Sequence, residues 1–430
     1  MYRHLLKCIA IITICALSFS CERKTNGWLQ DLNANIPVER LSLVLNQDTV
    51  QGASAIIAAT YPDEGTISLL NVFKEFDELD FNIAITELEN GSYVFSGYDS
   101  ISVVSSLLGT AITLNGTLSA DGTASITVDQ RWNGDFLKNW NVCDALLADA
   151  ESGQIVHAAG FLNWTSRYNS DTLCAENLSA MGTIALHSII DSYFKDITFY
   201  DDLSLSFHYC PDPGLTIDNL IQAVVEGTVP SVVQREWKES PQGMADWFFK
   251  DNILYIHFNI GAFVPFYNEL TGKNVDADFV ADIIMRLDGL AGSEIRELLA
   301  DLDGVDLEAV LTMFTDEQLE DIVSWLTDGF PLSVTQSLVE VNNQQVTITD
   351  LYVNQGFVDT FAGYMEGKLP EMETALKNMT VEVDGETLTG WDYFTYRTGF
   401  EAIDEFSRLW EQTYTFRIGT SLVDVPITGN

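Results

Sequence analysis

The most constraining feature of the chain is a series of short segments between Val38 and Gln130 in which apolar and polar residues alternate. Turn residues separate these segments about every ten positions. Successive side chains of a strand point to opposite faces, so this pattern predicts strands with one buried and one wet face. The pair Asp121-Gly122 lies between two such runs and supplies the positive-φ turn that a tight hairpin needs. We expect residues 38–131 to form an antiparallel β-barrel or sandwich.

A second clear signal is a hairpin in the middle of the chain. Met244–Lys250 and Ile253–Ile260 are both rich in strand-forming residues, and Asp251-Asn252 joins them as a turn. Alternation in the second arm places Tyr255 on the face opposite to Leu254. We therefore expect one face of this hairpin to be core and the other to be wetter.

Residues 276–329 carry the clearest helical pattern. Asp276 precedes the first apolar-periodic segment as an N-cap residue, and Thr315 with Gln318 forms a capping box before another. Helices this short and this close together must pack on one another or on a sheet. Residues 132–430 are thus expected to be a mixed α+β domain, which makes the whole chain α+β.

The first 21 residues, MYRHLLKCIAIITICALSFSC, have the pattern of an export signal. Arg3 and Lys7 form a basic head, Cys8–Leu17 is an apolar run, and small residues lead to Cys21. Ten apolar residues are too few to cross a bilayer core as a helix. We expect residues 1–20 to be a lipoprotein signal peptide that is removed.

Cleavage before Cys21 would make that cysteine the lipidated first residue of the mature chain. Two or more acyl chains are enough for stable membrane anchoring, and residues 21–37, which show no periodicity, would form a tether to the fold. The alternative is an ordinary secretory signal cut near Ser20, with Cys21 a free thiol.

Charge narrows the choice of partners. The chain has 63 acidic and 21 basic residues and a formal net charge of -42, so it repels nucleic acid and anionic lipid surfaces. Its hydrophobic content of 47% and aromatic content of 11% are far above the composition of disordered acidic chains. The acids are expected to coat a folded body.

Cysteine and histidine usage gives little sign of a metal or redox site. Cys143, Cys174 and Cys210 are disulfide candidates that allow three pairings, and we expect one disulfide and one buried thiol. No pair has C-x-x-C spacing, and the histidines past residue 130 are far apart. The acidic string Asp301–Glu308 could suggest calcium, but Gly304 stands fourth rather than sixth and fits a helix end. No metal and no cofactor are expected.

Catalytic motifs are missing from the sequence. It contains no G-x-S-x-G, no H-E-x-x-H, no phosphate-binding glycine loop and no G-x-G-x-x-G after a strand. Pairs of carboxylates suited to glycoside hydrolysis could meet in space, but nothing in the linear sequence selects two of the 63 acids.

Tryptophans are the remaining candidates for a ligand site. Trp325 and Trp410 fall on expected amphipathic helices, where core packing is the default. Trp237, Trp247 and Trp391 fall in expected strands beside charged residues. They are the candidates for stacking on a ligand, although a core position is the commoner outcome for each.

The middle of the chain resembles a domain of uncharacterised lipoproteins of gut Bacteroidales, and the N-terminal strands are similar to the calycin-like β-barrel that precedes it in such proteins. The segments that carry the resemblance are Phe194–Phe199 with Asp202, Leu203–Phe207, Trp237–Pro241 and Asp246–Tyr255. The resemblance implies an outer-membrane lipoprotein of the cell envelope without known catalytic residues. Surface-displayed lipoproteins of that phylum tend to have an acidic run after the lipidated cysteine. Here Arg23 and Lys24 stand there instead, so both a surface and a periplasmic facing are kept.

These observations together predict a non-catalytic, lipid-anchored envelope protein that binds a glycan, a small apolar molecule or an envelope partner, and no nucleic acid. A calycin-like barrel would hold an apolar ligand in its lumen. The competing hypotheses are a carbohydrate-active or other hydrolase that uses carboxylates of the C-terminal half, and a structural accessory of an envelope complex. A closed, apolar barrel lumen would favour the binder, and two carboxylates about 5 to 9 Å apart at the base of an aromatic cleft would favour the enzyme.

Overall fold

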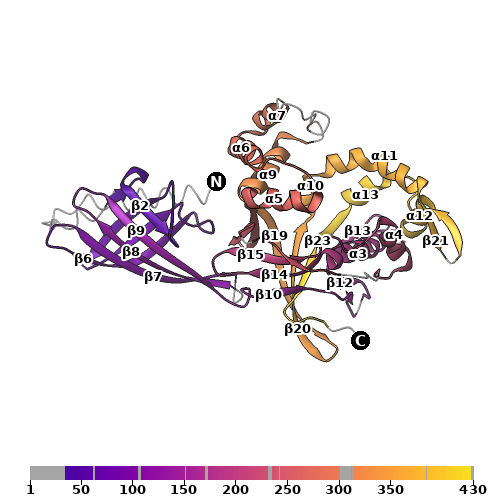
Figure 1. The fold of residues 1–430 in the computed structure, drawn as a ribbon, viewed down its shortest axis with the longest axis horizontal. Coiled ribbons are helices and arrows are strands. Elements are labelled where there is room, and N and C mark those ends of the chain that lie inside the picture. Colours follow the sequence, from indigo (N-terminus) through magenta and orange to yellow (C-terminus); the bar gives the residue numbers. More distant parts are fainter. Residues whose placement is uncertain are drawn as a thin grey trace. The chain divides into compact units, whose positions relative to one another are not determined.

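The computed structural model describes residues 34–427 except 62, 105–107, 151, 170–172, 231–234, 242, 301–310, 312–313 and 384. Cys21, the signal peptide, most of the tether and the acidic string Asp301–Glu308 lie outside the described residues. The described residues up to Ser102 together with Gly109–Trp132 form one compact unit, and the rest form a second (Figure 1).

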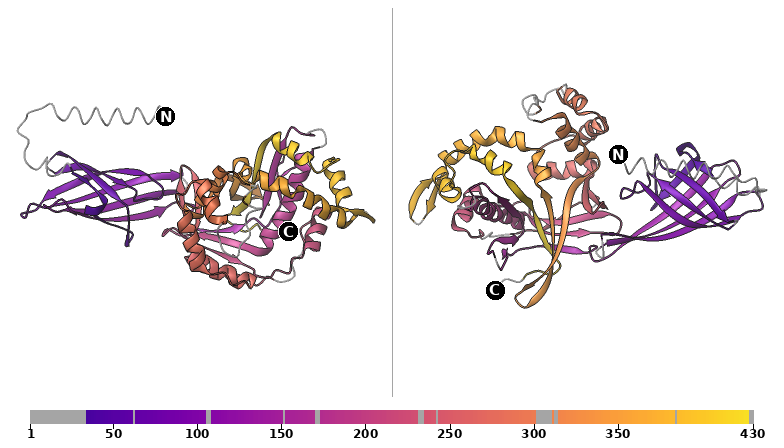
Figure 2. Two further views of the ribbon diagram at one scale, coloured as in Figure 1. Left: turned by 90° about the horizontal axis from the view of Figure 1, so that it is seen from above. Right: turned by 180° about the vertical axis from the view of Figure 1, so that it is seen from behind.

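The first unit is a closed β-barrel. Eight strands go round it, and a two-residue strand, β3 (Asp48–Thr49), extends β2 as a hairpin. The eight are β1 (Ala34–Ile36), β2 (Leu41–Leu45), β4 (Ser54–Tyr61), β5 (Glu64–Leu70), β6 (Glu78–Glu87), β7 (Tyr93–Val104), β8 (Leu108–Leu118) and β9 (Ala124–Asn133). Figure 2 shows the long strands β6 to β9 curving round the barrel.

Closure of the barrel depends on one passage of chain that pairs with both ends of the sheet. β1 pairs antiparallel with β4, where Ile36 lies opposite Ala55, and β2 pairs with β9, where Leu43 lies opposite Ile126. β1 and β2 follow each other along one side of the barrel and count as a single passage of the chain. With β4 to β9 they make seven passages, an odd number. Neighbours in such a ring cannot all alternate in direction, and the β2–β9 pair is accordingly parallel.

The interior of the barrel is filled by its own side chains. Inward positions alternate with exposed ones along β6 and β9, and Ile57, Ile67, Phe81, Leu114 and Ile126 are each at most 1% exposed within one hydrophobic cluster. Among the described residues, this packing counts against the expected apolar ligand in the lumen. A strand pattern predicts which face is buried but not whether the buried space is packed or hollow.

The second unit is built on a strongly curved ten-stranded sheet. The strand order is β10, β14, β15, β17, β18, β19, β20, β23, β13, with β16 paired to β15. β23 also pairs with β10, Asn141 lying opposite Val423, so the sheet nearly closes. The strands are β10 (Asn139–Val142), β13 (Phe161–Ser166), β14 (Phe194–Phe199), β15 (Ser204–Tyr209), β16 (Lys238–Glu239), β17 (Ala245–Lys250), β18 (Ile253–Phe258), β19 (Phe330–Val341), β20 (Gln344–Asn354) and β23 (Thr413–Val423).

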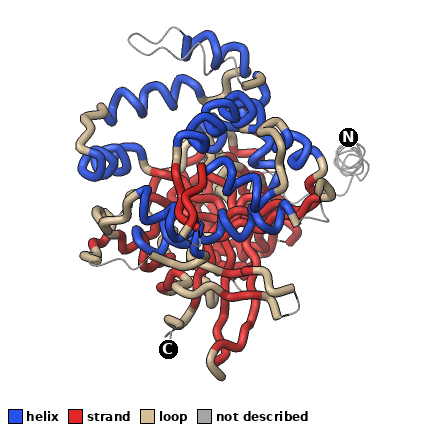
Figure 3. Tube along the Cα trace, turned by 90° about the vertical axis from the view of Figure 1, so that its right-hand side faces the viewer, coloured by secondary structure: helices blue, strands red, loops and turns tan. Residues whose placement is uncertain are grey.

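Helices gather on one side of these strands (Figure 3). Two small strand pairs accompany them: β11 (Leu147–Ala148) with β12 (Ile155–His157), and β21 (Thr380–Val383) with β22 (Glu386–Thr389). The helices are α3 (Cys174–Tyr193), α4 (Ile217–Glu226), α5 (Ile260–Thr271), α6 (Ala277–Leu287), α7 (Gly292–Ala300), α9 (Asp316–Thr327), α10 (Gln355–Asp359), α11 (Ala362–Asn378), α12 (Gly390–Thr398) and α13 (Glu405–Glu411).

The predicted helix starts at Asp276 and Thr315 are confirmed. The Asp276 side chain accepts the backbone N–H groups of Asp278 and Phe279 at the start of α6, and Thr315 and Gln318 form the capping box of α9. These caps satisfy donors that a short helix cannot satisfy by itself. They fix where α9 begins, and α9 is a wall of the cleft described below.

Candidate functional site

A cleft of about 260 Å³ lies where β18, β19 and β20 meet α9 and α10. We call it the aromatic cleft. Its lining residues are Ile253, Tyr255, Asp321, Trp325, Pro331, Ser333, Tyr352, Val353, Asn354, Gly356, Phe357 and Thr360. They come from four separate stretches of the chain, so only the fold brings them together.

The floor of the aromatic cleft is set by strand register. Ser333 of β19 lies opposite both Ile253 of β18 and Tyr352 of β20, and Tyr255 lies opposite Pro331. Directly opposed residues share a face, so these side chains form two adjacent rows on the same face of the sheet. Leu254, on the opposite face of β18, is fully buried, but Phe258 on that same face is 38% exposed, so the predicted core face holds only at the start of the strand.

The walls of the cleft are aromatic. Trp325 of α9 and Phe357 of α10 stack with ring centres 4.3 Å apart and an interplanar angle of 27°. The Asn354 side chain accepts the Phe357 N–H at 3.3 Å and so caps α10, which fixes the direction in which this helix leaves β20. A lining residue thus also positions one of the aromatic walls.

The polar groups of the aromatic cleft are mostly hydroxyls. Tyr255, Ser333, Tyr352 and Thr360 each carry one, and Asp321 is the single carboxylate among the described lining residues. Nearby, the Arg417 guanidinium carbon lies 4.9 Å from the ring centre of Tyr352. Arg417 therefore holds that ring through a cation–π contact.

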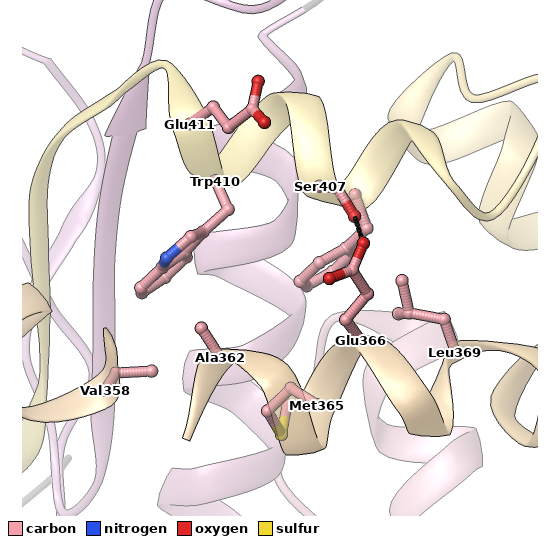
Figure 4. A pocket seen from close by; sticks show the side chains of 9 residues that line it. Val358, Ala362, Met365, Glu366, Leu369, Ser407, Trp410 and Glu411 are labelled. Atoms are coloured by element: carbon pink, nitrogen blue, oxygen red, sulfur yellow. Dashed lines mark hydrogen bonds between the residues drawn. The ribbon is translucent and has the colours of Figure 1, made fainter. Parts of the chain in front are cut away.

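A second hollow, of about 170 Å³, lies between α11 and α13 (Figure 4). We call it the α11–α13 groove. Its lining residues are Val358, Ala362, Met365, Glu366, Leu369, Phe406, Ser407, Trp410 and Glu411. The Trp410 ring points into it, and Glu366 reaches across it to Ser407. The groove is largely apolar, in contrast to the aromatic cleft.

A serine, a histidine and an aspartate meet elsewhere in the second unit. His157 Nδ1 lies 3.1 Å from Asp350 Oδ1, and Ser421 Oγ donates to the same oxygen at 2.6 Å. In a hydrolase triad the histidine stands between serine and carboxylate so that it can take the hydroxyl proton. Here the carboxylate stands in the middle and Ser421 is fully buried, so the group ties β12, β20 and β23 together and offers no nucleophile.

Buried charges beside α3 are also explained by structure. Asp191 pairs with Arg235 at 2.5 Å. Burial lowers the pKa of His187, whose Nδ1 accepts the Ala159 N–H at 3.1 Å, as a neutral ring can. Burial, followed by the nearby Asp191 carboxylate, raises the pKa of Asp144. Arg235 thus neutralises the buried Asp191, whereas Asp144 is exposed and is repelled by the Asp191 carboxylate.

The three tryptophan candidates from the sequence do not form a site. Trp247 of β17 is fully buried, packs on Phe136 and Phe199 and donates its Nε1–H to Ser204 O, so it is a core residue. Trp237 is partly exposed before β16. Trp391 lies on helix α12 rather than in a strand and stacks on Phe394.

The tryptophan that does line the aromatic cleft is Trp325, which we expected to be core. Asp321 and Trp325 are four residues apart on α9, a spacing that places both on one helix face. A carboxylate and an indole on the same face of a helix are the signal in the sequence that could have identified this wall.

The three cysteines of the described residues are buried free thiols, and the disulfide expected among them is not formed. Cys143 packs in a cluster with Val423, and Cys174 in another with Trp164. The clusters are separate, so these thiols are held apart by the packing of different parts of the sheet. Burial raises the pKa of both Cys143 and Cys174 to about 12.

The described residues contain neither a metal-binding cluster nor a helix that could span a membrane. Among the described residues, no three histidine, cysteine or acidic side chains lie close enough together to hold a metal ion. Nor does any helix in the described ranges combine the length and the apolar character that a membrane span requires.

No protein family, curated protein or solved structure matches this chain.

Proposed function

We propose that this protein is a non-catalytic, lipid-anchored protein of the cell envelope that binds a glycan in the aromatic cleft. The observation that carries the proposal is the make-up of that cleft. Trp325 and Phe357 form aromatic walls, the floor carries the hydroxyl residues Tyr255, Ser333 and Tyr352, and Asp321 of α9 adds one carboxylate. Binding sites commonly combine apolar walls with a few polar groups that fix orientation.

This combination suits the chemistry of a sugar ring. A pyranose has apolar C–H faces that pack on aromatic rings and a rim of hydroxyls that both donate and accept hydrogen bonds. Tyr255, Ser333 and Tyr352 offer hydroxyls of the same dual character, and Asp321 offers a charged acceptor. A purely apolar ligand would leave these polar groups without partners, which costs free energy.

The competing proposal is a carbohydrate-active or other hydrolase that uses carboxylates of the C-terminal half. Glycoside hydrolysis needs two carboxyl groups separated by about 5 to 9.5 Å. Among the described lining residues of the aromatic cleft, Asp321 is the single carboxylate. The cleft therefore favours binding over turnover.

The envelope location is proposed from the sequence. The export signal ending at Cys21 and the resemblance to Bacteroidales lipoproteins support an anchor in the outer membrane. The chain's strong negative charge favours a neutral or cationic ligand over nucleic acid. Intact-mass analysis of the native protein tests the anchor, since it should begin at an acylated Cys21.

A glycan array probed with the soluble form, residues 22–430, tests the ligand. The screen should return oligosaccharides that the protein retains, and titration calorimetry should show that Trp325→Ala weakens binding at least about tenfold, or about 1.4 kcal/mol. Asp321→Asn should weaken it similarly. Because Asp321 is exposed, this variant keeps the fold even if Trp325→Ala does not.

Trp237→Ala is the matched control, because Trp237 is a partly exposed tryptophan of the same unit outside the cleft. It should leave glycan affinity unchanged. Equal affinity in wild type, Trp325→Ala and Asp321→Asn would contradict the proposal, as would the absence of any retained glycan.

A further inference from the structure

Among its described lining residues, the α11–α13 groove offers a ligand hydrogen-bond acceptors but no free side-chain donors, unlike the aromatic cleft with its hydroxyls. Its two hydrogen-bond donors are already engaged: Ser407 Oγ donates to Glu366 Oε1 at 3.3 Å, and Trp410 Nε1 donates to Asp359 Oδ1 at 2.8 Å. What remains toward the groove is the acceptor capacity of a carboxylate. A ligand group that binds here must therefore donate hydrogen bonds.

Charge selects the same kind of group. Glu366 is exposed and reaches across the groove, while the described lining residues include no lysine, arginine or histidine (Figure 4). Glu411, on the opposite helix, points away from the hollow. An anionic ligand would meet only like charge, whereas an ammonium group would gain charge-assisted hydrogen bonds.

The apolar part of the groove limits the size of the ligand. Met365 and Leu369 of α11 and Phe406 and Trp410 of α13 all line this hollow of about 170 Å³. An apolar cavity of about 150 Å³ in another protein holds benzene. The groove therefore has room for one benzene-sized group with its ammonium at the side where Glu366 lies.

We propose that the α11–α13 groove is a second binding site, which takes an ammonium group attached to one benzene-sized apolar group. The ligand chemistry is a small arylalkylamine, whether it occurs as a free amine or as the amino terminus of a peptide that begins with an aromatic residue. The site does not depend on the aromatic cleft, because the two share no lining residue.

The test uses two probes of similar size and opposite charge on the soluble form, residues 22–430. Calorimetry should detect binding of 2-phenylethylamine and show at least about tenfold weaker binding, or none, for 3-phenylpropanoate. A third probe, phenylalanylglycinamide, distinguishes the two sources of the ligand. Binding tighter than that of the free amine assigns the site to peptide amino termini, and weaker binding assigns it to free amines. Either result supports the ammonium site.

Two glutamate variants locate the charge. Glu366→Gln should weaken 2-phenylethylamine binding at least about tenfold, and Glu401→Gln, the matched control at an exposed position outside the groove, should change it less than threefold. Both side chains are exposed, so both variants keep the fold, which unfolding midpoints verify. Equal binding of the two probes of opposite charge, no binding of the amine, or no effect of Glu366→Gln would overturn the proposal.

Discussion

The Thr183 hydroxyl of α3 accepts the backbone N–H of Leu162 at 3.0 Å and donates to the carbonyl oxygen of the same residue at 3.1 Å. A helix side chain thus makes both hydrogen bonds that a neighbouring strand would make to β13. One turn earlier, Ser179 does the same for Trp164, at 2.7 and 3.2 Å. The free edge of β13 is covered by a helix, which protects it from pairing with another chain.

This relationship predicts the effect of Thr183→Val. Valine keeps the shape of threonine but leaves the Leu162 N–H and C=O without partners in a partly buried environment, so the free energy of unfolding should fall by about 1–3 kcal/mol. Thr183→Ser keeps the hydroxyl and should cost less. Urea denaturation of both variants checks the order, and a Thr183→Val protein as stable as wild type would show that the hydroxyl is not needed.

Two glycines let α3 approach β13 this closely. A Cβ on Gly160 would lie 2.7 Å from the backbone C and O of Leu186, whereas a Cβ on Gly182 would lie 2.6 Å from the end of the Leu162 side chain. Gly160→Ala should therefore destabilise the protein by about 1–3 kcal/mol, because backbone atoms must move.

Gly182→Ala is the comparison for this prediction. A leucine side chain can rotate away, and alanine is about 1 kcal/mol better than glycine inside a helix, so this variant should stay near the stability of wild type. Thermal unfolding of the two variants measures the difference. A larger loss of thermal stability in Gly182→Ala than in Gly160→Ala would contradict the close contact between Gly160 and the Leu186 backbone.

Local features of the fold could be predicted from the sequence because they depend on neighbouring residues. The turns at Gly122, Asp251-Asn252 and Asn342-Asn343 all adopt positive φ, as their residue types indicate. The caps at Asp276 and Thr315 are present as expected. Each of these needs only a few consecutive residues.

Features that depend on distant pairing could not be predicted in the same way. The parallel β2–β9 pair and the β10–β23 contact join residues that are far apart in the sequence. Helix α12 was missed because the apolar residues around Trp391 alternate as they would in a strand, while Thr389 caps a helix there by accepting the Asp392 N–H. Here one local signal, the Thr389 cap, prevailed over another, the alternation.

The aromatic cleft was only half visible in the sequence. The wetter face of β18, which carries Tyr255, was predicted, but its partners Ser333, Tyr352 and Trp325 arrive from three other segments. Nothing in the order of residues shows that these segments meet. The candidates from the sequence were Trp237, Trp247 and Trp391, which have charged neighbours. Trp325, which lines the cleft, was predicted to be a core residue.

A buried carboxyl in the barrel gives a pH-dependent prediction. Glu75 is 6% exposed, and burial raises its pKa above the ordinary value of 4.5, an effect that the backbone and the charge of Lys74 only partly offset. Since the pKa of Glu75 is higher in the folded state, the protonated carboxyl stabilises the fold at low pH. This stabilisation is lost as pH rises from about 4.5 through the raised folded-state pKa.

Glu75→Gln removes this titration. The variant should therefore gain stability relative to wild type as the pH rises from 4 to 8, measured by urea denaturation at several pH values. Glu78→Gln, at an exposed position, controls for the loss of one negative charge. A difference between Glu75→Gln and wild type that shrinks with rising pH would contradict the assignment.

The cysteines give a chemical test of the fold. In a soluble form without residues 1–21, Cys143, Cys174 and Cys210 are the cysteines that remain, and all three should react with Ellman's reagent after unfolding without reductant. The folded protein should react slowly at pH 8, because burial raises the pKa of Cys143 and Cys174 to about 12 and the thiolate is the reactive form. A single reactive thiol in the unfolded protein would reveal a disulfide.

The most direct test of the central claim, that the aromatic cleft binds a glycan without cleaving it, is mass spectrometry of the glycan after incubation with the protein. An oligosaccharide selected on the array is incubated overnight with wild type and with Asp321→Asn, and the bound and free fractions are analysed. The account predicts that wild type retains the intact oligosaccharide and that Asp321→Asn retains much less. Shortened products that appear with wild type and not with Asp321→Asn would contradict it and would identify a hydrolase.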